Sequence, residues 1–246
     1  MRIKRRDSSL YRILVASVLL AAGCSSEETA KSPAVPPGQS GPEAAADSKA
    51  SAENRPRILI IGDSITAGYG LSPDRAYPAL LQSRIDSAGY RYEVVNAGLS
   101  GETTSGGARR IDWLLRGGAD IVVVELGGND GLRGIPPEVT EENLRSIIAL
   151  VRERNGDAAV VLGGMRMPMN MGERYRSEFE AVFSKVAAET GVIFIPHILE
   201  GVGGVPELNQ SDGIHPTAEG QRIIADNVWE YLEPVLEERL DEADAS

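Results

Sequence analysis

The stretch ILIIGDSITAGYG, residues 58–70, joins four aliphatic side chains to a glycine and then to an Asp-Ser pair. Short apolar runs of the same kind recur at residues 57–62, 92–97, 120–126, 158–164 and 191–196. Strands that are apolar on both faces are typical of a parallel sheet covered by helices on each side. The segments between the runs have the i, i+3, i+4, i+7 spacing of amphipathic helices, as in Leu144, Ile147, Ile148 and Val151. The sequence therefore predicts an α/β fold, a three-layer α/β/α sandwich with a five-stranded parallel sheet of flavodoxin-like order.

The first fifth of the chain has the composition of an export signal. Residues 1–12 carry five basic side chains, and residues 13–23 form an uncharged, mostly apolar run. That run is shorter than the roughly 20 residues that span a bilayer. It ends in LAAGC, which resembles the lipobox of bacterial lipoproteins, although Ala21 stands where leucine is usual. We expect residues 1–23 to be a lipoprotein-type signal peptide and Cys24 to be lipidated, so that the exported protein is anchored to a bacterial membrane and faces the periplasm. The alternative is an ordinary cleaved signal peptide with a chance cysteine.

Residues 24–56 are rich in Pro, Ala, Ser, Gly and charge, and Val35 is their only large aliphatic side chain. Such a segment buries too little apolar surface to offset its conformational entropy, which predicts a disordered tether before one folded domain at 57–246. Removing residues 1–23 takes away five basic residues and one acid and leaves a net charge of −15. This charge argues against a nucleic-acid partner, which requires a basic face. Cys24 is the only cysteine, so the chain has no intramolecular disulfide.

The polar and glycine-rich segments all follow the predicted strands. In an open parallel sheet the functional site forms at the carboxyl ends of the strands, where such segments meet. They are GDS at 62–64, GLSG at 98–101, GGND at 127–130, MRMPMNMG at 165–172 and, further on, SDGIHP at 211–216.

Ser64 has three possible uses in this setting: it can begin a helix, bind a phosphate or attack a substrate. A phosphate loop requires a lysine before the serine, and a G-x-S-x-G nucleophile elbow is absent from the chain. Attack requires a base, and the sequence has two histidines. His197 has no acid beside it and is predicted to be a structural or surface residue. Asp212 precedes His215 by three positions, so its carboxylate can orient that imidazole toward a hydroxyl, although D-x-x-H alone is a weak signal.

Acyl transfer also requires hydrogen-bond donors for the oxyanion. The backbone N–H groups of Ser64 and Gly98 and the side-chain amide of Asn129 follow three of the predicted strands. A simple turn is the alternative explanation for GGND.

Together GDS, the glycine after the second strand, GGND and DGIHP resemble the four blocks of the SGNH, or GDSL-type, hydrolases over residues 57 to about 236. GDSITAGYG and VVELGGNDGLRG are similar to the branch of multifunctional bacterial acyl-CoA thioesterases/lysophospholipases/arylesterases, with Ile65 where the GDSL name has leucine. The resemblance implies that Ser64 is the nucleophile, His215 the base and Asp212 its orienting acid. It also implies an oxyanion hole of Ser64, Gly98 and Asn129, and no metal or organic cofactor.

The expected function is that of a monomeric serine esterase. It would hydrolyse short- to medium-chain acyl esters through an acyl-enzyme on Ser64, with thioesters and lysophospholipids as further substrates. A carbohydrate O-deacetylase with the same site, and a non-catalytic lipid- or metal-binding lipoprotein, are the alternatives.

Two further segments are candidates for substrate contact. In the family, the loop after the oxyanion amide shifts when substrate binds, which implies closure by Gly131, Leu132, Arg133, Gly134, Ile135 and Pro136; a structural turn is the alternative. In an extended loop, Met165, Met167, Met169 and Met171 would share one face. They are expected to form a wall for acyl chains, to bind Cu(I) or to fill gaps in the core.

Overall fold

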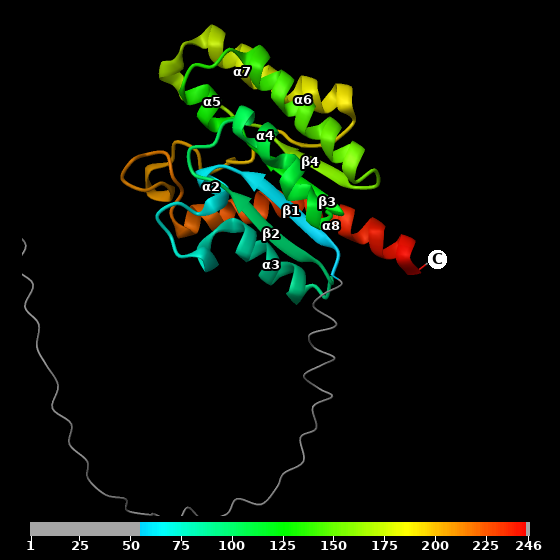
Figure 1. Ribbon diagram of the computed structural model, residues 1–246. Coiled ribbons are helices and arrows are strands. Elements are labelled where there is room, and N and C mark those ends of the chain that lie inside the picture. Colours follow the sequence, from blue (N-terminus) through cyan, green and yellow to red (C-terminus); the bar gives the residue numbers. More distant parts are fainter. Residues whose placement is uncertain (1–54, 245–246) are drawn as a thin grey trace, which may run out of the picture. The chain divides into compact units, whose positions relative to one another are not determined.

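The five apolar runs form the strands of one parallel sheet in the computed structural model, which describes residues 55–244 (Figure 1). The sheet order is β2-β1-β3-β4-β5, so the predicted flavodoxin-like order is confirmed. The signal peptide, Cys24 and nearly all of the predicted tether lie outside the described residues. The strands are β1 (Arg57–Gly62), β2 (Glu93–Gly98), β3 (Ile121–Glu125), β4 (Ala159–Gly163) and β5 (Ile193–Ile195).

Helices cover both faces of the sheet, as the alternation of apolar runs and amphipathic segments predicts. Helices α3 and α8 pack together on one face, and α4, α6 and α7 lie on the other (Figure 1). No helix within residues 55–244 combines the length and the apolarity that crossing a membrane requires. The helices are α2 (Ser64–Ala67), α3 (Tyr77–Ser87), α4 (Thr104–Leu114), α5 (Gly128–Leu132), α6 (Pro137–Arg154), α7 (Glu173–Thr190) and α8 (Ala218–Asp244), with short 3₁₀ turns at Pro73–Arg75, Leu115–Gly117, Met169–Met171 and Pro206–Leu208.

The core lies on both sides of the central strands. Every residue of β3 is buried, and β1 and β4 are buried except at their first residue, whereas the edge strands β2 and β5 are only partly covered. The four apolar side chains predicted to line one face of a helix at 144–151 are all buried in α6. The strand predicted at 191–196 begins later, at Ile193, because Gly191 takes a left-handed conformation that ends α7.

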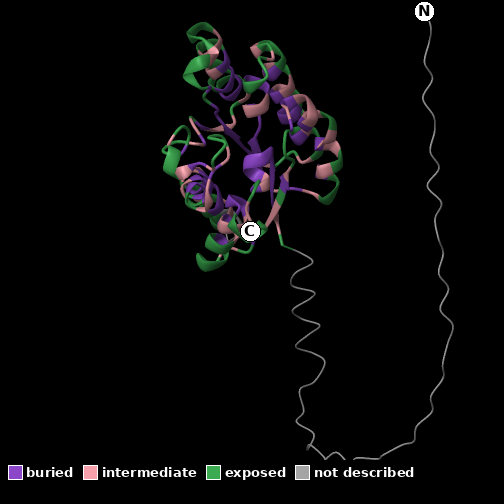
Figure 2. Cartoon of the chain, turned by 90° about the vertical axis from the view of Figure 1, so that its left-hand side faces the viewer, coloured by how far each residue is buried: buried purple, intermediate pink, exposed green. Residues whose placement is uncertain are grey.

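The register of the strands aligns their carboxyl ends. Gly62, the last residue of β1, pairs with Gly98 of β2 on one side and with Glu125 of β3 on the other. Figure 2 looks onto this edge, where buried segments at the centre are surrounded by exposed ones. The segments that follow β1, β2 and β3 therefore begin side by side, which is the placement predicted from the sequence.

Candidate active site

Ser64 is the first residue of α2, immediately after the central strand β1. Asp63 caps this helix, since its Oδ1 accepts a hydrogen bond from Ile65 N at 2.9 Å. Gly68, with φ of 70°, ends the helix after one turn. The backbone N–H of Ser64 precedes the first hydrogen bond of the helix, so it is available to an acceptor from outside.

The imidazole of His215 lies against the hydroxyl of Ser64, 151 positions away in the sequence. The distance from His215 Nε2 to Ser64 Oγ is 3.0 Å, and that from His215 Nδ1 to Asp212 Oδ2 is 2.6 Å. The structure thus brings together the three residues predicted to form a catalytic triad.

The loop that carries His215 is fixed by local hydrogen bonds. Gln210 N donates to His215 O at 2.7 Å, and Asn209 forms an isolated antiparallel bridge with Pro216. Asp212 Oδ1 accepts from Ile214 N and His215 N, at 2.9 and 3.0 Å. The loop therefore presents the imidazole in one orientation.

The charge on Asp212 determines which imidazole nitrogen carries the proton. The hydrogen bond with the His215 ring and those from the backbone N–H groups of His215 and Ile214 hold the pKa of Asp212 well below its usual range. An ionised carboxylate only accepts hydrogen bonds, so it places the imidazole proton on Nδ1. Nε2 is then free to accept the proton of Ser64 Oγ. The Tyr69 ring lies beside this imidazole, with 4.4 Å between ring centroids.

The amide of Asn129, in α5, is oriented by groups of opposite charge. Its Nδ2 donates to Asp63 Oδ2 at 2.9 Å, and its Oδ1 accepts from Arg133 Nη2 at 3.5 Å. These partners distinguish the nitrogen of the amide from its oxygen. The second N–H of the amide donates to no acceptor within residues 55–244. Arg133 Nη2 also donates to Gly101 O at 2.8 Å, which ties α5 to the loop after β2.

The backbone N–H of Gly98 is not available for its predicted role in the oxyanion hole. Its N–H donates to Asn96 Oδ1 at 2.9 Å and is therefore occupied. The absence of a side chain at Gly98 serves packing instead, because a Cβ there would lie 2.3 Å from Ala67 N of α2. Three residues later, the N–H of Gly101 donates to no acceptor within the described residues. The acceptor of the Gly98 N–H is the side chain of Asn96, which sequence reasoning did not consider.

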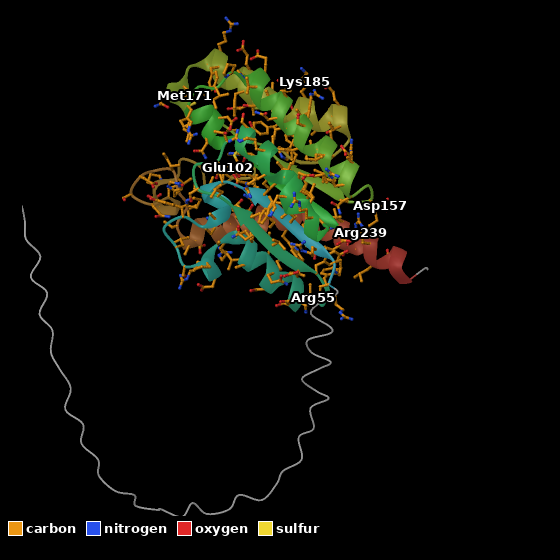
Figure 3. All side chains as sticks on the ribbon, in the orientation of Figure 1. Arg55, Glu102, Asp157, Met171, Lys185 and Arg239 are labelled. Atoms are coloured by element: carbon orange, nitrogen blue, oxygen red, sulfur yellow. The ribbon has the colours of Figure 1, made fainter. Side chains whose placement is uncertain are left out.

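The loop after β2 is anchored from α4. Glu102, labelled in Figure 3, is buried and pairs with Arg110, whose Nε lies 2.6 Å from Glu102 Oε2. Arg110 Nη2 also donates to Ala97 O at 2.7 Å. This partly buried ion pair fixes the segment that contains Gly98 and Gly101.

Three buried acids lie beneath the site. Asp63, Glu125 and Asp130 are each almost completely inaccessible to solvent. Burial raises the pKa of Asp63 to about 6 and raises that of Glu125 well above its usual value. Asp130 accepts hydrogen bonds from the backbone N–H and the hydroxyl of Thr104, at 2.8 and 2.5 Å. Sequence reasoning did not single out Asp63 or Glu125; the position of Asp63 directly before Ser64 is the only signal that could have indicated the first.

The loop at 131–136, predicted to close over substrate, is tied to α7. Tyr175 Oη donates to Ile135 O at 2.8 Å, and Gly131 is buried against the side chain of Met167. The methionines do not share one face: Met165 and Met167 are buried, whereas Met169 is 77% exposed. The 3₁₀ turn at Met169–Met171 ends the two-residue alternation that an extended loop would have. The two buried thioethers fill gaps in the core, which leaves the four-methionine wall and the copper site without their geometric basis.

The second histidine has an acidic partner that sequence reasoning missed. His197 Nδ1 lies 3.1 Å from Glu200 Oε2, three positions later, and Glu200 also pairs with Arg166. Burial lowers the pKa of this largely buried imidazole. Within residues 55–244 no group of His, Cys, Asp and Glu side chains is arranged to hold a metal ion.

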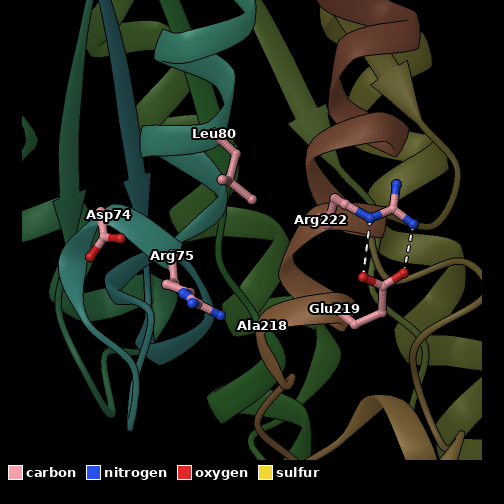
Figure 4. A pocket seen from close by; sticks show the side chains of 6 residues that line it. All are labelled: Asp74, Arg75, Leu80, Ala218, Glu219 and Arg222. Carbon is pink, nitrogen blue, oxygen red and sulfur yellow. Dashed lines mark hydrogen bonds and ion pairs between the residues drawn. The ribbon is translucent and has the colours of Figure 1, made fainter.

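A groove of about 520 Å³, shown in Figure 4, is lined by neither Ser64 nor His215. Within it, Arg222 Nη2 lies 2.6 Å from Glu219 Oε1. Its charged lining does not suit an acyl chain, so we do not assign it to substrate. The lining residues are Asp74, Arg75, Leu80, Ala218, Glu219 and Arg222.

Known proteins share this fold and these segments. Residues 60–223 match the model of the GDSL-like lipase/acylhydrolase family. Esterase TesA of Pseudomonas aeruginosa is 44% identical over 180 residues, covering 73% of this chain and 89% of that protein. The thioesterase 1/protease 1/lysophospholipase L1 of Escherichia coli K12 is 42% identical over 180 residues, covering 73% and 84%. The psychrotrophic esterase EstA from Pseudoalteromonas sp., in a structure inhibited by monoethylphosphonate, superposes with a TM-score of 0.69 at 32% identity, covering 74% of this chain and 98% of that one.

Proposed function

The chain belongs to the GDSL-like lipase/acylhydrolase family and is a carboxylic ester hydrolase, and we propose that Ser64 is its nucleophile, His215 its general base and Asp212 the acid that orients the base. The observation that carries this proposal is the 3.0 Å contact between Ser64 Oγ and His215 Nε2. The 2.6 Å contact of Asp212 with the other ring nitrogen supports it, because it leaves Nε2 able to accept a proton.

The reaction takes place in two stages. Ser64 Oγ attacks the ester carbonyl carbon while its proton passes to His215 Nε2, and a tetrahedral oxyanion forms. The carbon–oxygen bond to the alcohol then breaks, and His215 returns the proton to the leaving oxygen. In the second stage His215 takes a proton from water, and the water oxygen attacks the acyl carbon. The bond between that carbon and Ser64 Oγ then breaks, and His215 returns the proton to Oγ, which releases the acid and free Ser64.

The oxyanion is stabilised by three donors. We assign the N–H of Ser64, the free N–H of the Asn129 amide and the N–H of Gly101. Gly101 replaces Gly98 in this assignment because the Gly98 N–H is already donated to Asn96. The contact of Arg133 with both Gly101 and Asn129 supports the pairing of these two donors.

The substrates are esters with an apolar acyl or aryl group of short to medium length, with thioesters and lysophospholipids as further substrates. Four of the large apolar side chains that are exposed belong to the segments that carry the proposed catalytic groups. They are Tyr69, Leu99, Leu132 and Ile214. Contact between these side chains and the substrate removes apolar surface from water, worth roughly 0.8 kcal/mol for each fully buried CH₂.

A series of nitrophenyl esters from acetate to palmitate tests this substrate class. We expect kcat/KM to rise over the first members, and a Leu99→Ser variant to show a weaker rise. Trp113→Ser is the matched control, because Trp113 is also exposed but lies on α4, a helix that carries none of the proposed groups. Turnover of acetylated xylan without turnover of the longer nitrophenyl esters would instead identify an O-deacetylase. Failure to hydrolyse any ester would identify a binding protein.

We also propose that the enzyme is anchored to a membrane through its N-terminal sequence. LAAGC after the apolar run of residues 13–23 supports lipidation of Cys24, and residues 24–56 then serve as a tether from an anchor that faces the periplasm. Expression of the full gene with labelled palmitate should label the wild-type protein and leave Cys24→Ala unlabelled. Retention of the label by Cys24→Ala would refute the anchor. Light scattering of the purified protein tests the proposed monomeric state, which a molecular mass of two or more chains would contradict.

A further inference from the structure

Asp63 is a buried carboxylate that the mechanism above does not use. Its side chain is almost completely inaccessible, and each of its oxygens has a different partner. Oδ1 accepts from Ile65 N, at the start of the helix that carries Ser64, and Oδ2 accepts from Asn129 Nδ2, both at 2.9 Å. The carboxylate therefore bridges the segment that bears the nucleophile and the side chain proposed to bind the oxyanion.

We propose that Asp63 is a positioning residue that holds the Asn129 amide at the oxyanion site and couples it to the helix of Ser64. This inference rests on the proposed function. Asp63 takes one N–H of the amide, and Arg133 contacts the amide oxygen, so the second N–H has a fixed direction. An oxyanion hole accelerates the reaction because its donors need no reorganisation when charge develops, and this fixed direction provides that condition.

Glu125 supports Asp63 from below. Glu125 Oε2 accepts from Asp63 N at 3.2 Å and from Thr66 Oγ1 at 2.6 Å, while Oε1 is buried without a partner within residues 55–244. An ionised carboxylate with a buried, unpartnered oxygen is costly, so Glu125 is the protonated member of the pair. Asp63 has a donor on each oxygen and is therefore the member that ionises.

The groups around Asp63 make its charge sensitive to mildly acidic pH. Burial is the largest influence and raises its pKa to about 6; Asp130 of α5 acts in the same direction. The hydrogen bonds from Ile65 and Asn129 and the charge of His215 oppose this rise. Glu125 of β3 also faces Asp63 but is neutral. Protonation of Asp63 weakens its acceptance of the Asn129 N–H, because a bond to an ionised acceptor is the stronger one.

A double-mutant cycle on hydrolysis of nitrophenyl acetate tests the coupling. Asn has a single carbonyl oxygen, so Asp63→Asn can serve either Ile65 N or Asn129, but not both. We expect Asp63→Asn to lower kcat by roughly 10-fold or more and to change KM little, because the oxyanion exists only in the transition state. In an Asn129→Ala background the same change should lower kcat by less than about 3-fold.

The matched control is Asp120→Asn. Asp120 Oδ2 accepts from Arg57 N at 2.7 Å, at the opposite end of β1, so the substitution makes the same chemical change far from Ser64. Asp120→Asn should retain wild-type kcat. Equal losses from Asp63→Asn in both backgrounds, or no loss in either, would overturn the proposal.

A second measurement requires neither activity nor a variant at Asp63. The side-chain amide signals of Asn129 in the NMR spectrum, assigned by their absence from Asn129→Ala, should shift with a midpoint near pH 6. In His215→Gln the midpoint should persist and move upward, because the charge of His215 lowers the pKa of Asp63. Loss of the transition in His215→Gln would show that the amide follows His215 and would refute the role of Asp63. Inability of the wild type to hydrolyse esters would instead refute the proposed function, since this titration is independent of turnover.

Discussion

Replacement of Asp212 by Asn should make His215 adopt the wrong tautomer. Asp212 Oδ1 accepts two backbone N–H groups, from Ile214 and His215, and Oδ2 accepts the imidazole proton. Asn keeps one carbonyl oxygen, which must stay with the two backbone donors because no other acceptor replaces it. Its NH₂ group then faces His215 Nδ1 and favours the imidazole that carries its proton on Nε2. That nitrogen cannot accept the proton of Ser64.

The magnitude follows from how deeply this pair is buried. The same substitution costs about 10⁴ in kcat when the acid of a Ser-His-Asp triad is buried. Here the Asp212 side chain is 40% exposed and that of His215 18%, so water can partly replace the lost acceptor. We therefore expect a loss of roughly 10²–10³ in kcat/KM. The pKa of Asp212 lies well below its usual range, so the wild-type carboxylate is ionised and the loss should be present throughout pH 5–9.

The assay is initial-rate hydrolysis of nitrophenyl acetate across that pH range. Asp226→Asn is the control, because Asp226 forms an exposed ion pair with Arg84 on the surface of α8 and should have no effect. Both variants should melt close to the wild-type temperature. An Asp212→Asn protein that is folded and retains more than a tenth of the wild-type kcat/KM would refute the assigned role of Asp212.

Three further predictions concern the packing and the buried acids. Gly98→Ala places a Cβ 2.3 Å from Ala67 N, so it should reduce turnover and lower the free energy of unfolding by about 1–3 kcal/mol in urea titrations. Gly156→Ala is the control and should do neither, because its Cβ has no atom closer than 3.8 Å. The folded-state pKa of Asp63 is raised from 3.8 to about 6, so its protonation stabilises the folded protein at low pH, and up to about 3 kcal/mol of this stability is lost as pH rises through 6. The melting temperature of Asp63→Asn should lack this pH dependence. Parallel curves of melting temperature against pH for wild type and variant would contradict the prediction. Glu125→Gln should preserve stability and activity, because Glu125 is neutral, and a large loss in either would show that its charge is required.

The apolar runs and the four motif blocks were sufficient to predict most of the fold and the three residues of the proposed triad. The hydrophobic pattern was sufficient for β1, β3 and β4 because these strands are buried on both faces, and for α6 because its four core side chains follow the helical repeat. The meeting of Ser64 and His215 followed from topology, since the carboxyl ends of parallel strands share one edge.

The features that were missed depend on local backbone and side-chain geometry and on contacts between residues far apart in the sequence. Local pattern cannot show that the Asn96 side chain takes the N–H of Gly98, because this contact depends on the side-chain rotamer of Asn96 at the end of β2. The alternation of the methionines was a valid inference for an extended segment, but a 3₁₀ turn begins at Met169. The role of Asp63 depends on a neighbour 66 positions away, which no spacing in the sequence reveals.

The most direct test of the proposed nucleophile is mass spectrometry after reaction with a fluorophosphonate. We expect one adduct per chain on the peptide that contains Ser64 and no adduct on Ser64→Ala. Labelling of His215→Ala should be much slower, because no base accepts the hydroxyl proton. An adduct on a different serine, together with undiminished esterase activity of Ser64→Ala, would contradict the role of Ser64 as nucleophile.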